Sequence, residues 1–161
     1  MTGIDFCQEM LDLAPQKALR QNLDIKFELG DVLDLKFDDS TFDTVTIAYG
    51  IRNVEDTLGG LKEMWRILKP GGKLLILETG EGQGILSLPI KIYTKFVVPL
   101  LGGFISKKKH AYSYLSSSSQ AFPSKEKFIA LTQNLPNLES SNCKTLMFGA
   151  SYIYSVTKKN V

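Results

Sequence analysis

The chain has 161 residues, 43% of them hydrophobic and 22% charged, and its formal net charge is +2. This length fits one domain with a hydrophobic core, and the balance of apolar and charged residues excludes a disordered chain. Because the charge is close to neutral, there is no general basic surface that would favour nucleic acid as a partner.

The cysteines and the apolar segments indicate the cellular compartment in which we expect the protein. Cys7 and Cys143 stand in unrelated contexts, without a CxxC motif or a Cys/His cluster, so we expect neither a disulfide nor a metal site. The first ten residues have no basic leader followed by an apolar stretch, so we expect no signal peptide. The most apolar run, residues 96–105, contains Pro99 and is about half as long as a membrane-spanning helix. We therefore expect a cytoplasmic protein.

The first thirty residues have the pattern of a strand, a helix and a second strand. Residues 2–6 form the first predicted strand, with Asp5 near its end, and residues 25–30 form the second. Residues 8–20 have helical spacing, and Pro15 is expected to kink this helix. The apolar face of the helix is predicted to carry Met10, Ala14 and Ala18.

The middle of the chain repeats the alternation. Residues 44–48 are β-branched and apolar, which predicts a buried strand. Residues 56–68 follow the spacing of an amphipathic helix, and Pro70-Gly71-Gly72 ends it. Residues 73–78 then form another predicted buried strand.

The C-terminal half begins with a different pattern. Residues 85–115 consist of apolar segments broken by proline and glycine, which predicts a cap over the sheet. A helix is expected at 124–133 with Ser124 as its N-cap, followed by strands at 138–145 and 151–157. This order predicts one α/β domain over residues 1–161, with a single mixed sheet that is parallel except for the last strand.

Residues 30–78, and above all Gly50-Ile51-Arg52-Asn53-Val54 followed by the LKPGG of residues 68–72, resemble the ubiquinone/menaquinone biosynthesis C-methyltransferase family. The resemblance continues through TKFVVPLLG, YSYLSSSSQAFPSKEKF and the final strand. It implies a Rossmann-like class I methyltransferase fold with a helical cap insertion. It also implies S-adenosylmethionine as cofactor and methylation of a ring carbon of a polyprenylated quinol precursor.

The chain departs from the family at its start. The family's first strand runs into a glycine-rich turn beside the cofactor, whereas this sequence opens on the second strand. We therefore expect an N-terminally truncated domain that lacks a strand–turn–helix unit of roughly thirty residues. Weak or absent binding of S-adenosylmethionine by this chain alone is the predicted consequence.

Carboxylates at the ends of the first two strands are candidate cofactor ligands. Asp5 is placed to accept from the ribose hydroxyls, or else it only caps its strand. Asp31 is placed to accept from the adenine amino group, and the amide of Val32 to donate to the neighbouring ring nitrogen. An ordinary Gly-Asp turn is the alternative for this second pair.

Further candidates follow the strand at 44–48, at the edge where open α/β sheets bind ligands. Ala48 offers only a backbone contact, and Gly50 continues the loop. Tyr49 either faces the cofactor or fills the space beside it.

Arg52 and Asn53 are the predicted catalytic pair. Methylation of a ring carbon requires an electron-rich ring, so Arg52 would stabilise a phenolate and Asn53 would orient its oxygen or a water. The alternative for Arg52 is an ion pair with Glu55 or Asp56 at the helix start. Glu78, at the end of its strand, is an alternative proton acceptor or a structural residue.

The apolar segment 85–115 is the expected lid over a polyprenyl tail. Its lysines would meet anionic lipid heads in a peripheral membrane contact, and the alternative is a cap packed on its own core. A homo-oligomer is a further expectation. Two other functions remain open at this point: a catalytically dead remnant that only binds partners, and a methyltransferase for another small molecule.

Overall fold

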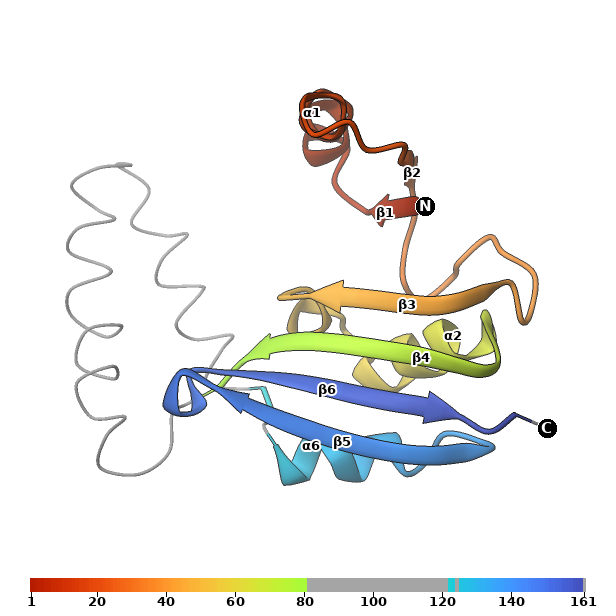
Figure 1. The fold of residues 1–161 in the computed structure, drawn as a ribbon, viewed down its shortest axis with the longest axis vertical. Coiled ribbons are helices and arrows are strands. Elements are labelled where there is room, and N and C mark those ends of the chain that lie inside the picture. The colour runs from red at the N-terminus through yellow and green to blue at the C-terminus, as the bar shows by residue number, and fades with distance from the viewer. Residues whose placement is uncertain (81–121, 124, 161) are drawn as a thin grey trace.

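The computed structural model describes residues 1–80, 122–123 and 125–160, so the predicted cap at 85–115 lies outside the described residues (Figure 1). The first unit is a two-stranded parallel sheet of β1 (Thr2–Asp5) and β2 (Lys26–Leu29). The connection between its strands is helix α1 (Gln8–Arg20). This is the strand–helix–strand arrangement that the sequence predicted for the first thirty residues.

The second unit is a four-stranded sheet with one reversed strand. Across the sheet the order is β3 (Phe42–Ala48), β4 (Leu68–Thr79), β6 (Ser151–Lys158) and β5 (Leu138–Leu146). β3 and β4 are parallel, and β6 is antiparallel to both of its neighbours. The expectation that only the last strand is reversed is therefore confirmed.

The prediction of a single sheet is wrong. Among the described residues, β1 pairs only with β2 and β3 pairs only with β4, so the two sheets share no ladder of hydrogen bonds (Figure 1). β3 is consequently an edge strand of the larger sheet. Thr44, Thr46 and Ala48 are exposed, and the prediction of a buried strand here is wrong for the same reason.

The described helices of the second unit are α2 (Thr57–Arg66), α6 (Glu126–Thr132) and the short 3-10 helices η1 (Ile51–Asn53) and η4 (Met147–Gly149). α2 begins after Asp56, whose Oδ1 accepts from the Gly59 amide at 2.9 Å, as an N-cap should. α2 ends at Arg66, before the predicted limit, because Leu68 already pairs with Phe42 of β3.

The main core lies between the four-stranded sheet and the two helices α2 and α6. Buried side chains of β4 and β6 alternate along each strand, as expected for a sheet covered on one face. The largest fully buried side chains include Trp65 from α2, Phe128 from α6 and Tyr152 and Tyr154 from β6. The Trp65 indole also donates to Pro136 O at 2.8 Å, which fastens α2 to the segment before β5.

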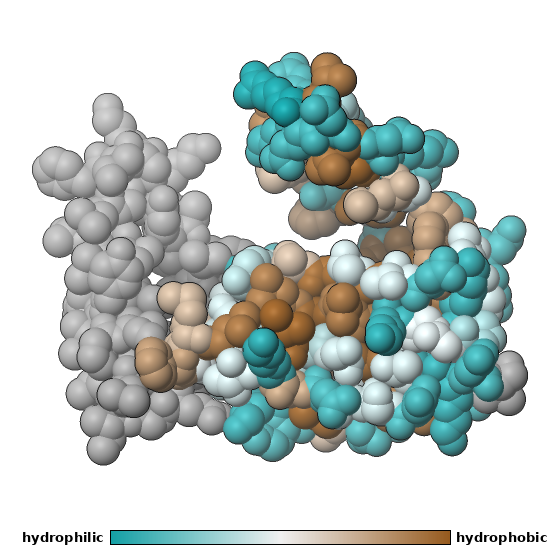
Figure 2. All heavy atoms as spheres, viewed as in Figure 1, coloured by the Kyte–Doolittle hydropathy of each residue, from teal (hydrophilic) through white to brown (hydrophobic). Residues whose placement is uncertain are grey.

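The other face of the same sheet is also apolar at its centre. Apolar residues gather over the middle of the sheet on the face shown in Figure 2. Leu75, Leu77 and Ile153 alternate with core residues along their strands and are only half-buried.

Two local predictions are corrected. On α1 the buried residues are Leu11 and Ala18, whereas Met10 is 53% exposed, so the apolar face is rotated from the predicted one. The helix runs through Pro15. The N-cap of α6 is Lys125 with φ +49°, while the predicted cap Ser124 lies outside the described residues.

Candidate active site

The carboxyl ends of β1 and β2 bring the two predicted cofactor carboxylates to one edge. Asp5 is opposite Leu29 in the parallel register, and the Gly30 amide donates to Asp5 O at 3.0 Å. A Cβ added to Gly30 would lie 2.9 Å from Ile4 Cγ2, so only glycine permits this close approach. Asp31 is therefore the next residue after Gly30, whose amide is hydrogen-bonded to Asp5.

Each of these carboxylates uses one oxygen to close a local turn. Asp5 Oδ1 accepts from the Cys7 amide, and Asp31 Oδ1 accepts from the Leu33 amide, both at 2.9 Å. Asp5 is half-buried and Asp31 is exposed. The strand-cap and turn roles that the sequence left as alternatives are thus present, and in each carboxylate the oxygen Oδ2 has no hydrogen bond to the described residues.

Val32 joins this turn to the second unit. It is half-buried and packs against the main core, and a Cβ added to Gly60 of α2 would lie 3.6 Å from Val32 Cγ1. The turn after β2 therefore packs within van der Waals distance of the first turns of α2. The segment after β2 is therefore held close to the helix that follows η1.

The end of β3 carries a strained backbone. Tyr49 has φ +55°, a conformation that L-residues other than Asn and Asp rarely adopt. Its amide donates to Leu77 O of β4 at 2.8 Å, and its side chain is 43% exposed. Ala48 ends the strand, and Gly50 is the N-cap of η1, so the predicted loop residues are contiguous at this edge.

Arg52 lies in η1 and forms a buried ion pair with Glu78 near the end of β4. Arg52 Nη1 is 2.7 Å from Glu78 Oε1, and the two side chains are 6% and 0% exposed. The same Nη1 donates to Thr79 Oγ1 at 2.9 Å. The predicted alternative, a pair between Arg52 and Glu55 or Asp56, is wrong because the guanidinium turns to β4 instead.

The carboxylate of Glu78 accepts from several donors at once. Its Oε1 also accepts from the Thr79 amide at 2.7 Å and the Thr79 hydroxyl at 3.2 Å, and its Oε2 accepts from the Arg52 amide at 3.4 Å. These contacts give Glu78 a structural role, which was one of its two predicted alternatives.

Both side-chain hydrogen bonds of Arg52 to the described residues come from Nη1, which leaves Nε and Nη2 without one. Arg52 Nε is buried and has no acceptor among the described residues. Such orphaned donors are uncommon in native proteins because losing hydration without a partner is costly. Asn53, the other predicted catalytic residue, is exposed at the end of η1, and its amide donates to Gly50 O at 3.0 Å.

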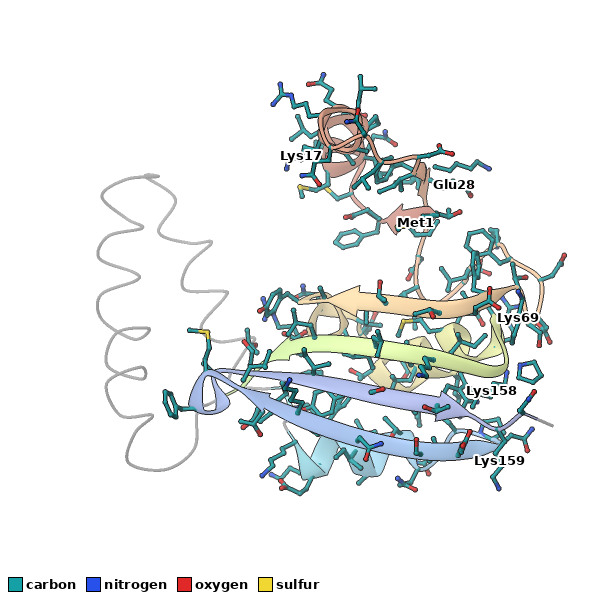
Figure 3. The ribbon with its side chains drawn as sticks, viewed as in Figure 1. Met1, Lys17, Glu28, Lys69, Lys158 and Lys159 are labelled. Atoms are coloured by element: carbon teal, nitrogen blue, oxygen red, sulfur yellow. The ribbon has the colours of Figure 1, made fainter. Side chains whose placement is uncertain are left out.

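The sequence indicated both Arg52 and Glu78 but missed their pairing and the part of Thr79. The two charges are 26 positions apart, and no spacing rule connects a 3-10 turn to the end of the next strand. The basic residues labelled in Figure 3 on β4 and at the end of β6, namely Lys69, Lys158 and Lys159, lie at the opposite end of the four-stranded sheet. Arg52 lies in η1, which follows the carboxyl end of β3, and so places a cation near that end.

Comparison with solved structures shows the class of protein that this fold defines. A SAM-dependent methyltransferase from Thermotoga maritima matches with a TM-score of 0.69 and 22% identity, over 98% of this chain and 72% of that one. A second, from Methanosarcina mazei, matches with a TM-score of 0.62 and 20% identity, over 98% and 81%. The fold is that of S-adenosylmethionine-dependent methyltransferases, as the sequence predicted.

The family is shown by sequence. The model of the ubiE/COQ5 methyltransferase family matches residues 1–158, and the chain belongs to this family of enzymes. It is 42% identical to the ubiquinone/menaquinone biosynthesis C-methyltransferase UbiE of Bdellovibrio bacteriovorus, over 99% of this chain and 68% of that protein. It is 44% identical to a demethylmenaquinone methyltransferase of Deinococcus radiodurans, over 79% and 53%. The chain thus spans from 53% to 68% of these relatives' length.

Proposed function

We propose that this protein takes part in S-adenosylmethionine-dependent methylation of a ring carbon in a polyprenylated quinol precursor of ubiquinone or menaquinone. The observation that carries the proposal is Arg52, a buried guanidinium near the carboxyl end of β3 whose Nε has no acceptor among the described residues. The names of the relatives support the quinone-type substrate.

The residues at the carboxyl ends of β1 and β2 fit the adenosine part of the cofactor. Asp5 and Asp31 each have an Oδ2 without a hydrogen bond to the described residues, and carboxylate oxygens accept from ribose hydroxyls and from an exocyclic amine. The Val32 amide is the proposed donor to the adenine ring. Ala48, Tyr49 and Gly50 would line the neighbouring part of the site. The sulfonium of the bound cofactor supplies the methyl group.

Arg52 is the proposed electrostatic partner of the acceptor oxygen. A ring carbon becomes nucleophilic when its phenol gives its proton to a water that relays it to solvent. A guanidinium stays charged at any ordinary pH, so Arg52 would stabilise the phenolate without acting as a base. Asn53, one residue on, would orient that oxygen or a water. Alignment of ring and methyl donor contributes the remainder of the rate.

The proposed contacts with the polyprenyl tail of the substrate and with the membrane involve residues outside this site. Residues 85–115, the proposed lid for a polyprenyl tail with lysines for lipid heads, lie outside the described residues. None of the described helices is long and apolar enough to cross a bilayer. A cytoplasmic protein in peripheral contact with the membrane, assembled as a homo-oligomer, stays our proposal.

The test is methyl transfer by a form of the protein that binds S-adenosylmethionine, such as the fusion described in the next paragraph, with and without Arg52→Ala. Binding of S-adenosylmethionine is measured separately by calorimetry. We expect turnover to fall by about 10²–10³ in the variant while cofactor affinity is retained, as for loss of one preorganised donor. Arg66→Ala, which removes a guanidinium from α2, is the control for general destabilisation. Unchanged turnover in Arg52→Ala would return Arg52 to a structural role.

A second candidate function is binding without catalysis. The edges of β1 and β3 that are unpaired among the described residues favour it. To separate the two, binding and turnover are measured in the chain alone and in a fusion that supplies a glycine-rich strand–turn–helix unit from the Bdellovibrio relative. If the protein is a catalyst, we expect weak cofactor binding by the chain alone, and restored binding and turnover in the fusion. A fusion that binds S-adenosylmethionine but transfers no methyl group to any quinol would support the binding function.

A further inference from the structure

We propose that Glu78 is a positioning residue that fixes the guanidinium of Arg52 for methyl transfer. The inference rests on the proposed function of Arg52. It assigns to Glu78 neither acid nor base chemistry. Its role is to hold Arg52 in one orientation, with Nε left over for an acceptor.

The geometry ties both ends of Arg52 to the same carboxylate. Glu78 Oε1 accepts from the side-chain Nη1 at 2.7 Å, and Oε2 accepts from the main-chain amide of Arg52 at 3.4 Å. The Thr79 amide and hydroxyl hold Oε1 from the other side. The carboxylate therefore contacts both the main chain of η1 and the edge of the guanidinium that faces β4.

Burial makes this arrangement rigid. Glu78 is fully buried and Arg52 is 6% exposed, so neither charge can exchange its partner for water. A buried charge that loses its partner is strongly destabilised, which leaves the pair few alternative arrangements. Glu78 is on the row of β4 that also carries Leu74 and Ile76, and packing of that row in the core fixes the carboxylate.

The consequence for chemistry concerns Nε. With Nη1 occupied by Glu78 and Thr79, the edge of the guanidinium that carries the buried Nε and the Nη2 group remains for an oxygen of the acceptor. A guanidinium free to rotate would present different nitrogens in turn and would lose the preorganisation that makes such donors effective. Glu78 would thus act on the reaction only through Arg52.

The first test measures the orientation of Arg52 and requires no activity. Exchange of the Arg52 Nε–H proton with water is followed by NMR in wild type and in Glu78→Gln, with the backbone amide spectrum as the check of folding. We expect exchange of this proton to accelerate about tenfold or more, because the released side chain opens to solvent. The control is Glu63→Gln, which breaks the Glu63–Arg66 ion pair of α2 and should leave the Arg52 signal unchanged.

If Glu78→Gln does not fold, Glu78→Asp is the second variant, since it keeps the charge and withdraws the carboxylate by one methylene. It should accelerate the same exchange to a smaller extent. An unchanged Arg52 Nε–H exchange rate in the folded variant overturns the proposal.

The second test is a double-mutant cycle. It measures turnover in the fusion that supplies the glycine-rich strand–turn–helix unit. Arg52→Ala and Glu78→Gln should each lower kcat, and the double variant should be no slower than Arg52→Ala alone, because Glu78 acts through Arg52. A further loss of about tenfold from Glu78→Gln in the Arg52→Ala background would show an independent role and overturn the proposal. Wild-type kcat in Arg52→Ala would instead contradict the proposed function, and the NMR test would still decide whether Glu78 positions Arg52.

Discussion

The guanidinium carbon of Arg52 lies 6.0 Å from the centre of the Tyr49 ring. Tyr49 reaches this position from a backbone with φ +55°, while its ring remains 43% exposed. A left-handed conformation costs an L-residue roughly 1–2 kcal/mol, and an exposed cation–π contact returns about 0.5–1 kcal/mol. The fold therefore gains little from a tyrosine at this position, and we propose that the ring serves the site.

The first prediction separates the two roles of Tyr49. Tyr49→Gly removes the strain and the ring together, so the free energy of unfolding should change by no more than about 1 kcal/mol. Methyl transfer should fall, since the surface beside Arg52 is lost. Urea unfolding and a turnover assay measure the two effects. Tyr49→Phe, which keeps the ring, is the control and should retain turnover, and a loss of stability well beyond 1 kcal/mol in Tyr49→Gly would show that the ring supports the fold.

The second prediction concerns Glu63, which fastens α2 to the segment before β3. Its carboxylate accepts from Arg66 Nε at 3.0 Å, from Arg66 Nη2 at 2.8 Å and from the Leu35 amide at 3.0 Å. We expect Glu63→Gln to lower the free energy of unfolding at neutral pH by about 1–2 kcal/mol, as for loss of hydrogen bonds to a charged group. Chemical denaturation measures this, and Glu139→Gln on the exposed side of β5 is the control.

The same residue predicts a dependence on pH. Hydrogen bonds from the Arg66 guanidinium hold the pKa of the Glu63 carboxyl below its usual value of 4.5. The folded state therefore binds this proton less readily than the unfolded state. The stabilisation is complete above the unfolded pKa and is lost as the pH falls through the lower folded pKa. Stability of Glu63→Gln should fall less steeply than that of wild type below pH 4.5, and parallel curves would contradict this assignment.

The third prediction concerns the start of α6. The buried hydroxyl of Tyr154 accepts from the Lys125 amide at 2.6 Å, and burial raises the pKa of Tyr154. Tyr154→Phe leaves that amide without this acceptor, so unfolding should become easier by about 1–3 kcal/mol. Hydrogen exchange should show the largest loss of protection at the Lys125 amide. Unchanged protection there would mean that another group takes over the bond.

Much of the fold follows from the sequence because its signals are local. The apolar alternation of β4 and β6, the helical spacing of α1 and α2, and the N-cap Asp56 are each set by a few neighbouring residues. The split of the sheet could not be predicted in this way, because strand pairing depends on contacts between distant segments. The buried character expected for β3 failed for the same reason.

The candidate site shows the same division. The loop from Ala48 to Asn53 and the carboxylates Asp5 and Asp31 could be placed at strand ends from pattern and resemblance. The partner of Arg52 could not, since pairing with Glu78 depends on how η1 folds back over β4. By charge alone, Glu55 and Asp56 were equally plausible ion-pair partners of Arg52, and they are nearer in sequence. In the structure Asp56 serves as the N-cap of α2.

The last prediction concerns the edge strand β3, whose outer backbone is unpaired among the described residues. Natural edge strands carry charges that block further pairing, and β5 on the opposite edge has Glu139 and Lys144. β3 has only Asp43 at its start, and it exposes Thr46 near its centre. We therefore expect the chain on its own to self-associate through β3, with a mass in light scattering that rises with concentration. Thr46→Lys should reduce this association, whereas Thr145→Lys on β5 should leave it unchanged. A monomer at every concentration, with a single cooperative unfolding transition, would show that the β3 edge is protected in solution.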